Sequence, residues 1–310
     1  MPIGLAQDPA SGRRLGETYQ IAYAPTLSAL KVATDQLKAA SSSSLTEVIN
    51  PTKDLPSTEI EGALVANYFK PERIKRLDHQ TATPTAVLDA LKGRSHWHFS
   101  THGTFSWGDA RRSGLFMKGH EVLTVGTLLE AQGLGRPRLV VLSACETGLY
   151  DIIRNPDEFM GLPGTFMGLG AAGVLASLWP VDDRATALLI AKFYELHRGH
   201  GLTPAAALQR AQAWLGQATR AELVAYVQRA AAKNPEQALT FAGLQSSLEK
   251  RAAGFDVLAE RLARKAVGGA GKPLGQTRTD QTKSQLDASS SKEKPFAHPY
   301  FWAGFIHTGL

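Results

Sequence analysis

RLVVLSACETG, residues 138–148, joins a nearly continuous apolar run to the only cysteine of the chain. A short run of this kind, with no polar alternation, is typical of a strand that is covered on both faces. Such strands occur in parallel sheets that carry helices on each side. The stretch therefore predicts a buried strand over 138–144, with Cys145 just past its carboxyl end.

Similar runs before and after this strand predict a mostly parallel sheet. Helical periodicity between the runs implies right-handed βαβ units, because strands that alternate with helices of this length build an α/β fold. The expected strands are 17–24, 45–50, 96–100, 138–144, 173–179 and the end of HPYFWAGFIHTGL (298–310). The expected helices are 57–69, with Ser57 as N-cap, 84–92, 183–199 and 203–216.

The chain of 310 residues, 43% of them hydrophobic, is long enough for one large domain. We expect a single domain over 1–310. Within it, residues 219–294 form a helical and flexible insertion before the final strand, because residues 268–294 are polar and of low complexity.

The bulk composition predicts a soluble protein of a reducing compartment. A lone cysteine permits no internal disulfide and excludes a Cys-rich zinc site, which fits the cytoplasm. No apolar run is long enough to span a membrane and no secretory signal is visible, so we expect no membrane partner. The net charge of +6 is densest in KPERIKR (70–76), but no aromatic residues are interleaved there, so direct nucleic-acid binding is not expected.

Two reactive side chains follow predicted strands of this sheet. His102 comes after HWHFS (96–100), and Cys145 comes after 138–144. Loops at the carboxyl edge of a parallel sheet converge, so the two side chains are expected to meet. A cysteine peptidase needs a thiolate, a histidine that transfers protons and N–H donors for the oxyanion. His102 and Cys145 suit the first two roles, and the backbone N–H groups of Gly103 and Cys145 suit the third.

Other interpretations of these residues remain open. A cysteine at the end of an apolar strand is commonly a buried small hydrophobe, and a single histidine is commonly structural. His96, His98 and His102 form H-x-H-x-x-x-H, which is a conceivable zinc site. Thr101 stands where a metallo-β-lactamase-like site would have Asp, so His96 and His98 are more simply residues of a strand and we expect no metal.

SLWPVDDR (177–184) follows the strand next to the cysteine strand, so its loop is expected beside the dyad. Asp182 and Asp183 would present negative charge there, which suits the forked guanidinium of an arginine at substrate position P1. An Asp just before a helix is also a common N-cap. We expect Asp183 to be the substrate contact and Asp182 to be the cap.

The sequence resembles the CHAT domain family, relatives of caspases and separases. The resemblance rests on YQIAYAPTLSAL, HFSTHG with His102, LVVLSACETG with Cys145, GLPGTFMGLGAAGVLASLWPVDD, two helices after it and HPYFWAGFIHTG, in family order from about residue 18 onwards. It implies a caspase-like three-layer α/β sandwich and a Cys–His dyad of His102 and Cys145. It also matches Asp183 with the aspartate by which separases bind a P1 arginine.

From the resemblance we expect a cysteine endopeptidase that acts on a protein or peptide substrate without a cofactor. Family members often carry a sensor module, so a regulatory sensor or tetratricopeptide-repeat partner is expected to control low basal activity. The loops 149–158 and 268–294 are the candidates for gating or processing. The alternative is a catalytically silent CHAT-type interaction module.

Overall fold

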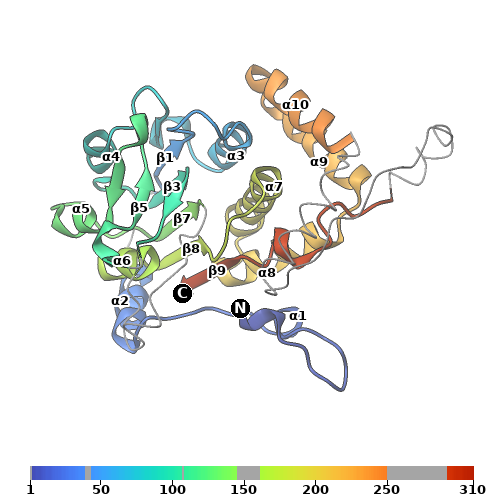
Figure 1. Cartoon of the computed structure of the whole chain (residues 1–310), viewed down its shortest axis with the longest axis horizontal. Helices are drawn as coiled ribbons and strands as arrows, with labels where there is room; N and C mark the ends of the chain where they lie inside the picture. The colour runs from blue at the N-terminus through green and yellow to red at the C-terminus, as the bar shows by residue number, and fades with distance from the viewer. Residues whose placement is uncertain (1, 39–42, 107, 145–160, 250–291) are drawn as a thin grey trace.

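The computed structural model describes residues 2–38, 43–106, 108–144, 161–249 and 292–310. A six-stranded sheet runs through its centre (Figure 1) in the order β2-β1-β3-β7-β8-β9. All neighbouring strands are parallel except the last pair, β8 and β9. The strands are β1 (Leu45–Ile49), β2 (Ile74–Leu77), β3 (His96–Ser100), β7 (Leu139–Ser143), β8 (Gly173–Ser177) and β9 (Phe305–Gly309).

Helices cover both faces of this sheet, which makes the three layers of an α/β sandwich (Figure 1). One face carries α2 (Leu27–Lys38), α4 (Pro84–Leu91), α5 (Val125–Glu130) and α6 (Leu162–Gly168). The other carries α3 (Ser57–Ala66), α7 (Asp183–Tyr194), α8 (Pro204–Gln217), α9 (Arg220–Lys233) and α10 (Ala238–Glu249). The short helix α1 (Leu15–Thr18) packs against α8.

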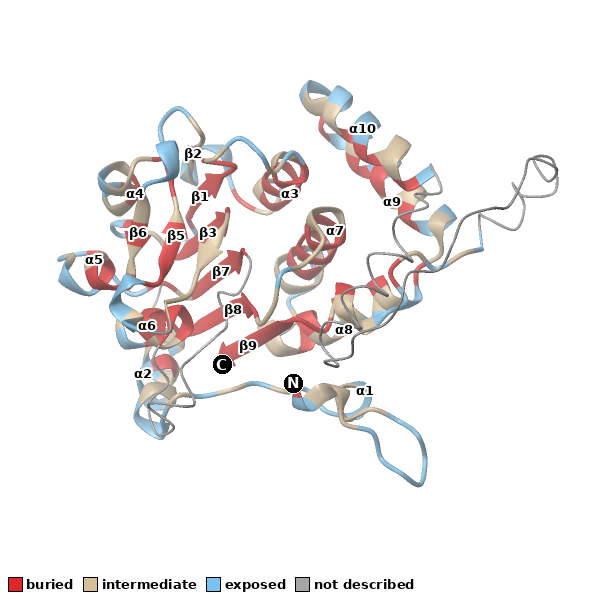
Figure 2. Cartoon of the chain, in the orientation of Figure 1, coloured by how far each residue is buried: buried red, intermediate tan, exposed pale blue. Residues whose placement is uncertain are grey.

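Each face of the sheet has its own hydrophobic core, and the central strands contribute side chains to both cores. In β7, Val141 belongs to the core under α3 and α7, whereas Val140 and Leu142 belong to the core on the opposite side. The burial pattern therefore explains the unbroken apolar run of the sequence, because alternate side chains of a strand point to opposite faces. Figure 2 shows the central strands as buried along their length.

A second, three-stranded antiparallel sheet lies beside the end of β3. It consists of β4 (Gly103–Thr104), β5 (Gly114–Phe116) and β6 (Val122–Thr124). The turn of the β5–β6 hairpin falls at Lys118–His120, where Gly119 has a φ of 67°. The hairpin holds the residues after β3, because β5 bonds the backbone of His102 and Gly103.

From β1 onwards the expected strands and helices occur in the expected order, but strand β2 was not predicted and two local predictions were wrong. Residues 17–24 form no strand, because the polar start of the segment enters α1 and only Tyr23 makes a bridge, to Thr308 of β9. Ser57 is not the N-cap of α3: the cap position is Pro56, and Ser57 is the first helical residue. The segment expected as one helix over 183–199 continues past Tyr194 as a π-helical turn, Glu195–Gly199.

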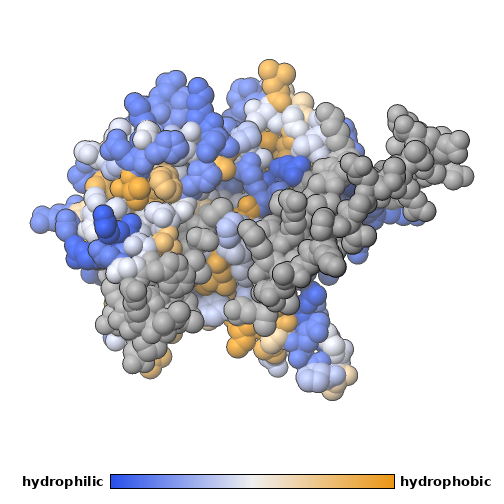
Figure 3. All heavy atoms as spheres, viewed as in Figure 1, coloured by the Kyte–Doolittle hydropathy of each residue, from blue (hydrophilic) through white to orange (hydrophobic). Residues whose placement is uncertain are grey.

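The surface in Figure 3 is mixed, with hydrophilic residues over the part that holds β1 and α4 and apolar residues in separate small patches. None of the described helices is both long and apolar enough to cross a membrane.

Candidate active site

The candidate residues follow the carboxyl ends of four neighbouring parallel strands. Asp54 follows β1, His102 follows β3 and Asp183 follows β8. Since these strands are parallel, the loops after them share one edge of the sheet, which is the usual ligand-binding edge of an open α/β sheet. Cys145 follows β7, between β3 and β8, and lies outside the described residues.

His102 is held by both its backbone and its ring. Its carbonyl accepts a hydrogen bond from Phe116 N of β5 at 2.9 Å, and the next residue, Gly103, pairs with Leu115. Its Nε2 lies 3.0 Å from each carboxylate oxygen of Asp54. The ring stays 35% exposed, so it is anchored at one nitrogen and accessible to solvent. The Asp54 carboxylate therefore engages the ring at Nε2.

The loop that carries Asp54 has an unusual backbone. Asn50 and Lys53 have positive φ angles of 48° and 67°. Asn50 Oδ1 accepts a hydrogen bond from Leu55 N at 3.0 Å, which closes the loop on itself. Positive φ is strained for a lysine, and strained loop residues cluster at functional sites. The loop thus has a defined shape that directs Asp54 towards His102.

Hydrogen bonds keep Asp54 ionised. The Thr52 hydroxyl donates to Asp54 Oδ1 at 2.5 Å, and this bond is the largest cause that holds the pKa of Asp54 below its usual 3.8. The bond and charge interaction with His102 act in the same direction. A carboxylate beside Nε2 fixes the ring orientation and stabilises an imidazolium, as the third member of a catalytic triad does.

Asp54 was not predicted as a site residue. The residue lies in a loop with no recognisable motif. The signal that was present is positional, because a strand ending at Asn50 must deliver its following loop to the same edge as His102 and Cys145.

The residues that lead into Cys145 are described and firmly held. Ser143 and Ala144 are buried, and Ser177 Oγ of β8 donates a hydrogen bond to the Ala144 carbonyl at 2.6 Å. The chain therefore leaves β7 in a fixed direction immediately before the cysteine.

Asp182 and Asp183 both have structural partners. Asp182 Oδ1 accepts from Arg184 N and Ala185 N, at 3.1 and 3.0 Å, so Asp182 is the N-cap of α7 as expected. Asp183 Oδ2 accepts from Ser57 N at 3.0 Å, which links the first turns of α7 and α3. Burial is the main cause that raises the pKa of Asp183 above 3.8, and the bond from Ser57 opposes it.

The three histidines of H-x-H-x-x-x-H have separate partners. His96 Nδ1 lies 2.9 Å from Ser95 Oγ, His98 Nε2 lies 2.9 Å from Glu61 Oε1, and His102 contacts Asp54. Burial lowers the pKa of His96 to about 3. Within the described ranges, no three His, Cys, Asp or Glu side chains are grouped as a metal would require.

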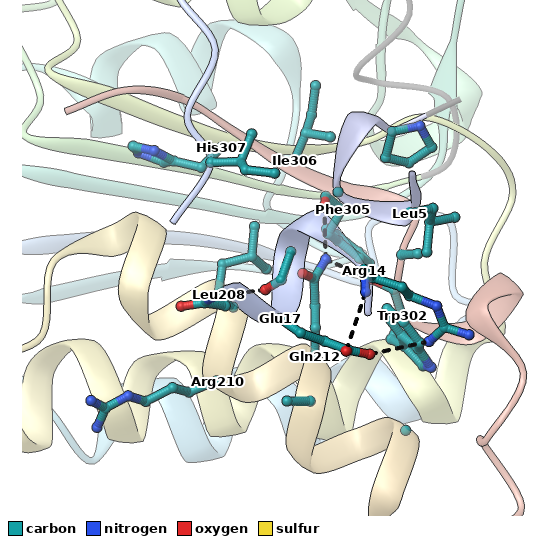
Figure 4. A pocket seen from close by; sticks show the side chains of 18 of the residues that line it. Leu5, Arg14, Glu17, Leu208, Arg210, Gln212, Trp302, Phe305, Ile306 and His307 are labelled. Atoms are coloured by element: carbon teal, nitrogen blue, oxygen red, sulfur yellow. Dashed lines mark hydrogen bonds and ion pairs between the residues drawn. The ribbon is translucent and has the colours of Figure 1, made fainter. Parts of the chain in front are cut away.

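A cavity of about 480 Å³ lies beside the outermost strand β9, between the N-terminal segment, α8 and β9 (Figure 4). Its lining includes Arg14, Gln212 and Trp302, and Arg14 lies over the Trp302 ring at 5.6 Å. Neither His102 nor Asp54 lines it. The candidate residues His102 and Asp54 therefore lie outside this cavity.

Comparison with protein families matches the CHAT domain over residues 1–310. The chain belongs to the CHAT domain family. Its CHAT domain is the three-layer α/β sandwich with the mostly parallel sheet described above. No curated protein matches the sequence significantly.

The solved structures that are similar to the CHAT chain include the following two. One is a complex of the pro- and mature domains of Porphyromonas gingivalis RgpB (14% identity, TM-score 0.41, 55% of this chain and 41% of that chain). The other is the Arg-specific cysteine proteinase gingipain R (13% identity, TM-score 0.43, 59% of this chain and 46% of that chain). The chain thus spans less than half the length of each of these proteins.

Proposed function

We propose that this CHAT domain is a cysteine endopeptidase in which Cys145 is the nucleophile and His102 transfers the proton. The observation that carries the proposal is the contact between His102 Nε2 and Asp54 at the sheet edge where the cysteine strand ends. A histidine anchored at one nitrogen by an ionised carboxylate is oriented for proton transfer at the other.

The reaction follows from these roles. His102 Nδ1 takes the proton of the Cys145 thiol, and the thiolate attacks the scissile carbonyl. The backbone N–H groups of Gly103 and Cys145 stabilise the oxyanion. The imidazolium, stabilised by Asp54, then protonates the leaving amine, and water hydrolyses the acyl-enzyme. No cofactor takes part in these steps.

The proposed substrate is a protein or peptide cleaved after a basic residue. Support comes from the two carboxylates at the start of α7, which follow β8 on the same edge as His102. Asp183 is the proposed contact for a P1 arginine, and Asp182 caps the helix. The backbone N–H and the hydroxyl of Ser57 both hydrogen-bond the Asp183 carboxylate, which holds its charge at the start of α7.

We further propose cytoplasmic action under the control of a sensor or tetratricopeptide-repeat partner, with low basal activity. The lone cysteine supports a reducing compartment. The proposed gating segments, 149–158 and most of 268–294, lie outside the described residues.

The test compares Cys145→Ala and His102→Ala with wild type, and His200→Ala serves as a control because that side chain is 63% exposed on the surface. Wild type should react with iodoacetamide faster than a free thiol near neutral pH, and a proteome-wide cleavage map should lose its sites in both dyad variants but not in the control. Loss of either dyad residue should cost several powers of ten in cleavage rate. Reactivity equal to that of a free thiol, with an unchanged cleavage map, would instead identify a catalytically silent interaction module.

A further inference from the structure

A buried glutamate of α3 lies beneath the two strands that carry the dyad. Glu61 is fully buried, and both of its carboxylate oxygens are engaged. Ser100 Oγ donates to Oε1 at 2.6 Å, and Ser143 Oγ donates to Oε2 at 2.9 Å. His98 Nε2 also lies 2.9 Å from Oε1. One carboxylate therefore bridges β3 and β7 through a hydroxyl on each.

The two serines that Glu61 bridges lie at the ends of their strands, close in sequence to His102 and Cys145. Ser100 and Ser143 are paired in register, and each is the last residue of its strand. His102 lies two residues after Ser100, and Cys145 lies two residues after Ser143. The Glu61 carboxylate thus fixes the relative position of the two points at which the chain turns towards the dyad.

Stability alone gives a poor reason for a carboxylate here. The free energy lost when a charge is removed from water offsets most of the stabilisation that its hydrogen-bonding partners provide. Apolar residues of similar volume often stabilise such sites equally well. Ile60, Leu64 and Val65 of the same helix pack in the core on this face of the sheet. A leucine at position 61 would join them, but it would leave Ser100 and Ser143 without their common acceptor.

We infer that Glu61 is a positioning residue that braces the ends of β3 and β7 and so aligns His102 with Cys145. This inference rests on the proposed peptidase function. The reaction needs the imidazole and thiol at hydrogen-bonding distance, and a displacement of about 1 Å can cost about 100-fold in rate. Hydrogen bonds from one rigid helix to both strand ends limit such displacement.

The test measures the alkylation rate of Cys145 by iodoacetamide against pH in the full chain. A thiolate paired with an imidazole reacts at lower pH than a free thiol does. Glu61→Gln keeps the volume but cannot accept from both serines. We expect its rate near pH 6 to fall at least 10-fold towards that of His102→Ala, and kcat for peptide cleavage to fall similarly while KM changes less than 2-fold.

Ser143→Ala distinguishes bracing from electrostatics, because it breaks one bond of the bridge and leaves the Glu61 charge in place. It should slow alkylation in the same direction as Glu61→Gln, and the double variant should show less than the sum of the two effects, since both remove one interaction.

Two variants serve as matched controls. Glu47→Gln removes another fully buried carboxylate on the same face, which pairs with Arg76 and not with either serine. Ser95→Ala removes a buried hydroxyl just before β3, at the opposite end of the strand, where it bonds Ser44. Both should change the melting temperature while the pH profile of alkylation stays that of wild type.

The outcomes separate the two proposals. If wild-type Cys145 reacts no faster than it does in His102→Ala, the peptidase function fails and the brace fails with it. If wild type is accelerated but Glu61→Gln and Ser143→Ala follow its profile, only the brace is overturned. A slowed profile in Glu47→Gln equal to that in Glu61→Gln would also overturn it, because buried charge in general would then be responsible.

Discussion

Asp183 combines a structural bond with a charge that burial disfavours. Its carboxylate accepts from Ser57 N, yet burial raises its pKa above 3.8. An acid whose folded pKa is raised contributes stability below its unfolded pKa and loses that contribution as pH rises through the folded pKa. Ionised Asp183 therefore destabilises the folded state at neutral pH. Such a cost is expected of a residue whose role is to bind a positively charged group of the substrate.

Asp183→Asn should separate these roles, because the amide oxygen can still accept from Ser57 N. We expect cleavage after arginine to fall at least 100-fold in kcat/KM, since the guanidinium loses its charged partner. Cleavage of a matched alanine peptide should not change. The melting temperature of the variant relative to wild type should rise as the pH increases from 3 to 7, because only wild type ionises.

Asp182→Asn is the control for this experiment, because asparagine caps helices as well as aspartate does. It should leave the arginine preference intact. An equal loss on arginine and alanine peptides in Asp183→Asn would assign Asp183 to the fold alone, and a loss confined to Asp182→Asn would move the substrate contact to that residue.

At the residue scale, the sequence was sufficient to predict site residues that come directly after a strand. His102 and Gly103 lie where the run HWHFS predicted them. Asp54 and Glu61 were missed, because their partners come from other elements: Asp54 meets a histidine 48 positions away, and Glu61 meets Ser143 across 82 positions. Helical periodicity alone does not show that Glu61 faces the core, because that conclusion also requires the position of the sheet beneath the helix.

At the scale of elements, the β5–β6 hairpin supports the histidine. Phe116 of β5 donates its N–H to the His102 carbonyl, and Gly103 pairs with Leu115. The close approach of the two hairpin strands depends on Gly114. A Cβ at this position would lie 2.4 Å from the Leu123 carbonyl oxygen, which no side chain tolerates without a backbone shift.

Gly114→Ala should therefore destabilise the protein by about 1–3 kcal/mol, the usual cost of overpacking. Because the displaced strand carries the donor to His102, kcat should fall as well at temperatures where the variant is folded. Gly108→Ala is the control, since nothing lies within 4 Å of its added Cβ, and it should change stability by less than about 0.5 kcal/mol. Chemical denaturation measures both, and an unaffected Gly114→Ala would show that the hairpin tolerates separation.

Elements were predicted best where periodicity and turn signals agreed. Helix α4 spans Pro84–Leu91 and α8 spans Pro204–Gln217, each within one residue of the expected 84–92 and 203–216. The segment 17–24 failed because its alternation of apolar residues resembles a strand, whereas only Tyr23 pairs with the edge strand β9. Whether an apolar segment pairs along its length depends on the partner that tertiary structure offers, which local pattern does not encode.

At the scale of the whole molecule, the sheet joins two cores. Phe166 of α6 is buried on one face, against Trp97 at 5.9 Å between ring centroids, and Phe193 of α7 is buried on the other, against Tyr194 at 5.4 Å. Strands β7 and β8 contribute alternate side chains to both cores. Melting of either helical layer would expose one face of the same strands, so the two layers should lose their structure together.

This coupling predicts a single unfolding transition for the described α/β core, to which substitutions in either layer contribute alike. Phe166→Ala and Phe193→Ala should each lower stability by about 3–5 kcal/mol, the usual cost of a large cavity in a core. Both should shift one calorimetric peak to lower temperature, with calorimetric and van't Hoff enthalpies still equal. The exposed Leu239→Ala in α10, whose side chain is 90% exposed, is the control and should leave the peak in place. Two resolved peaks in either core variant would mean that the layers fold independently, and the sheet would then not transmit changes in the α3 layer to the hairpin that holds His102.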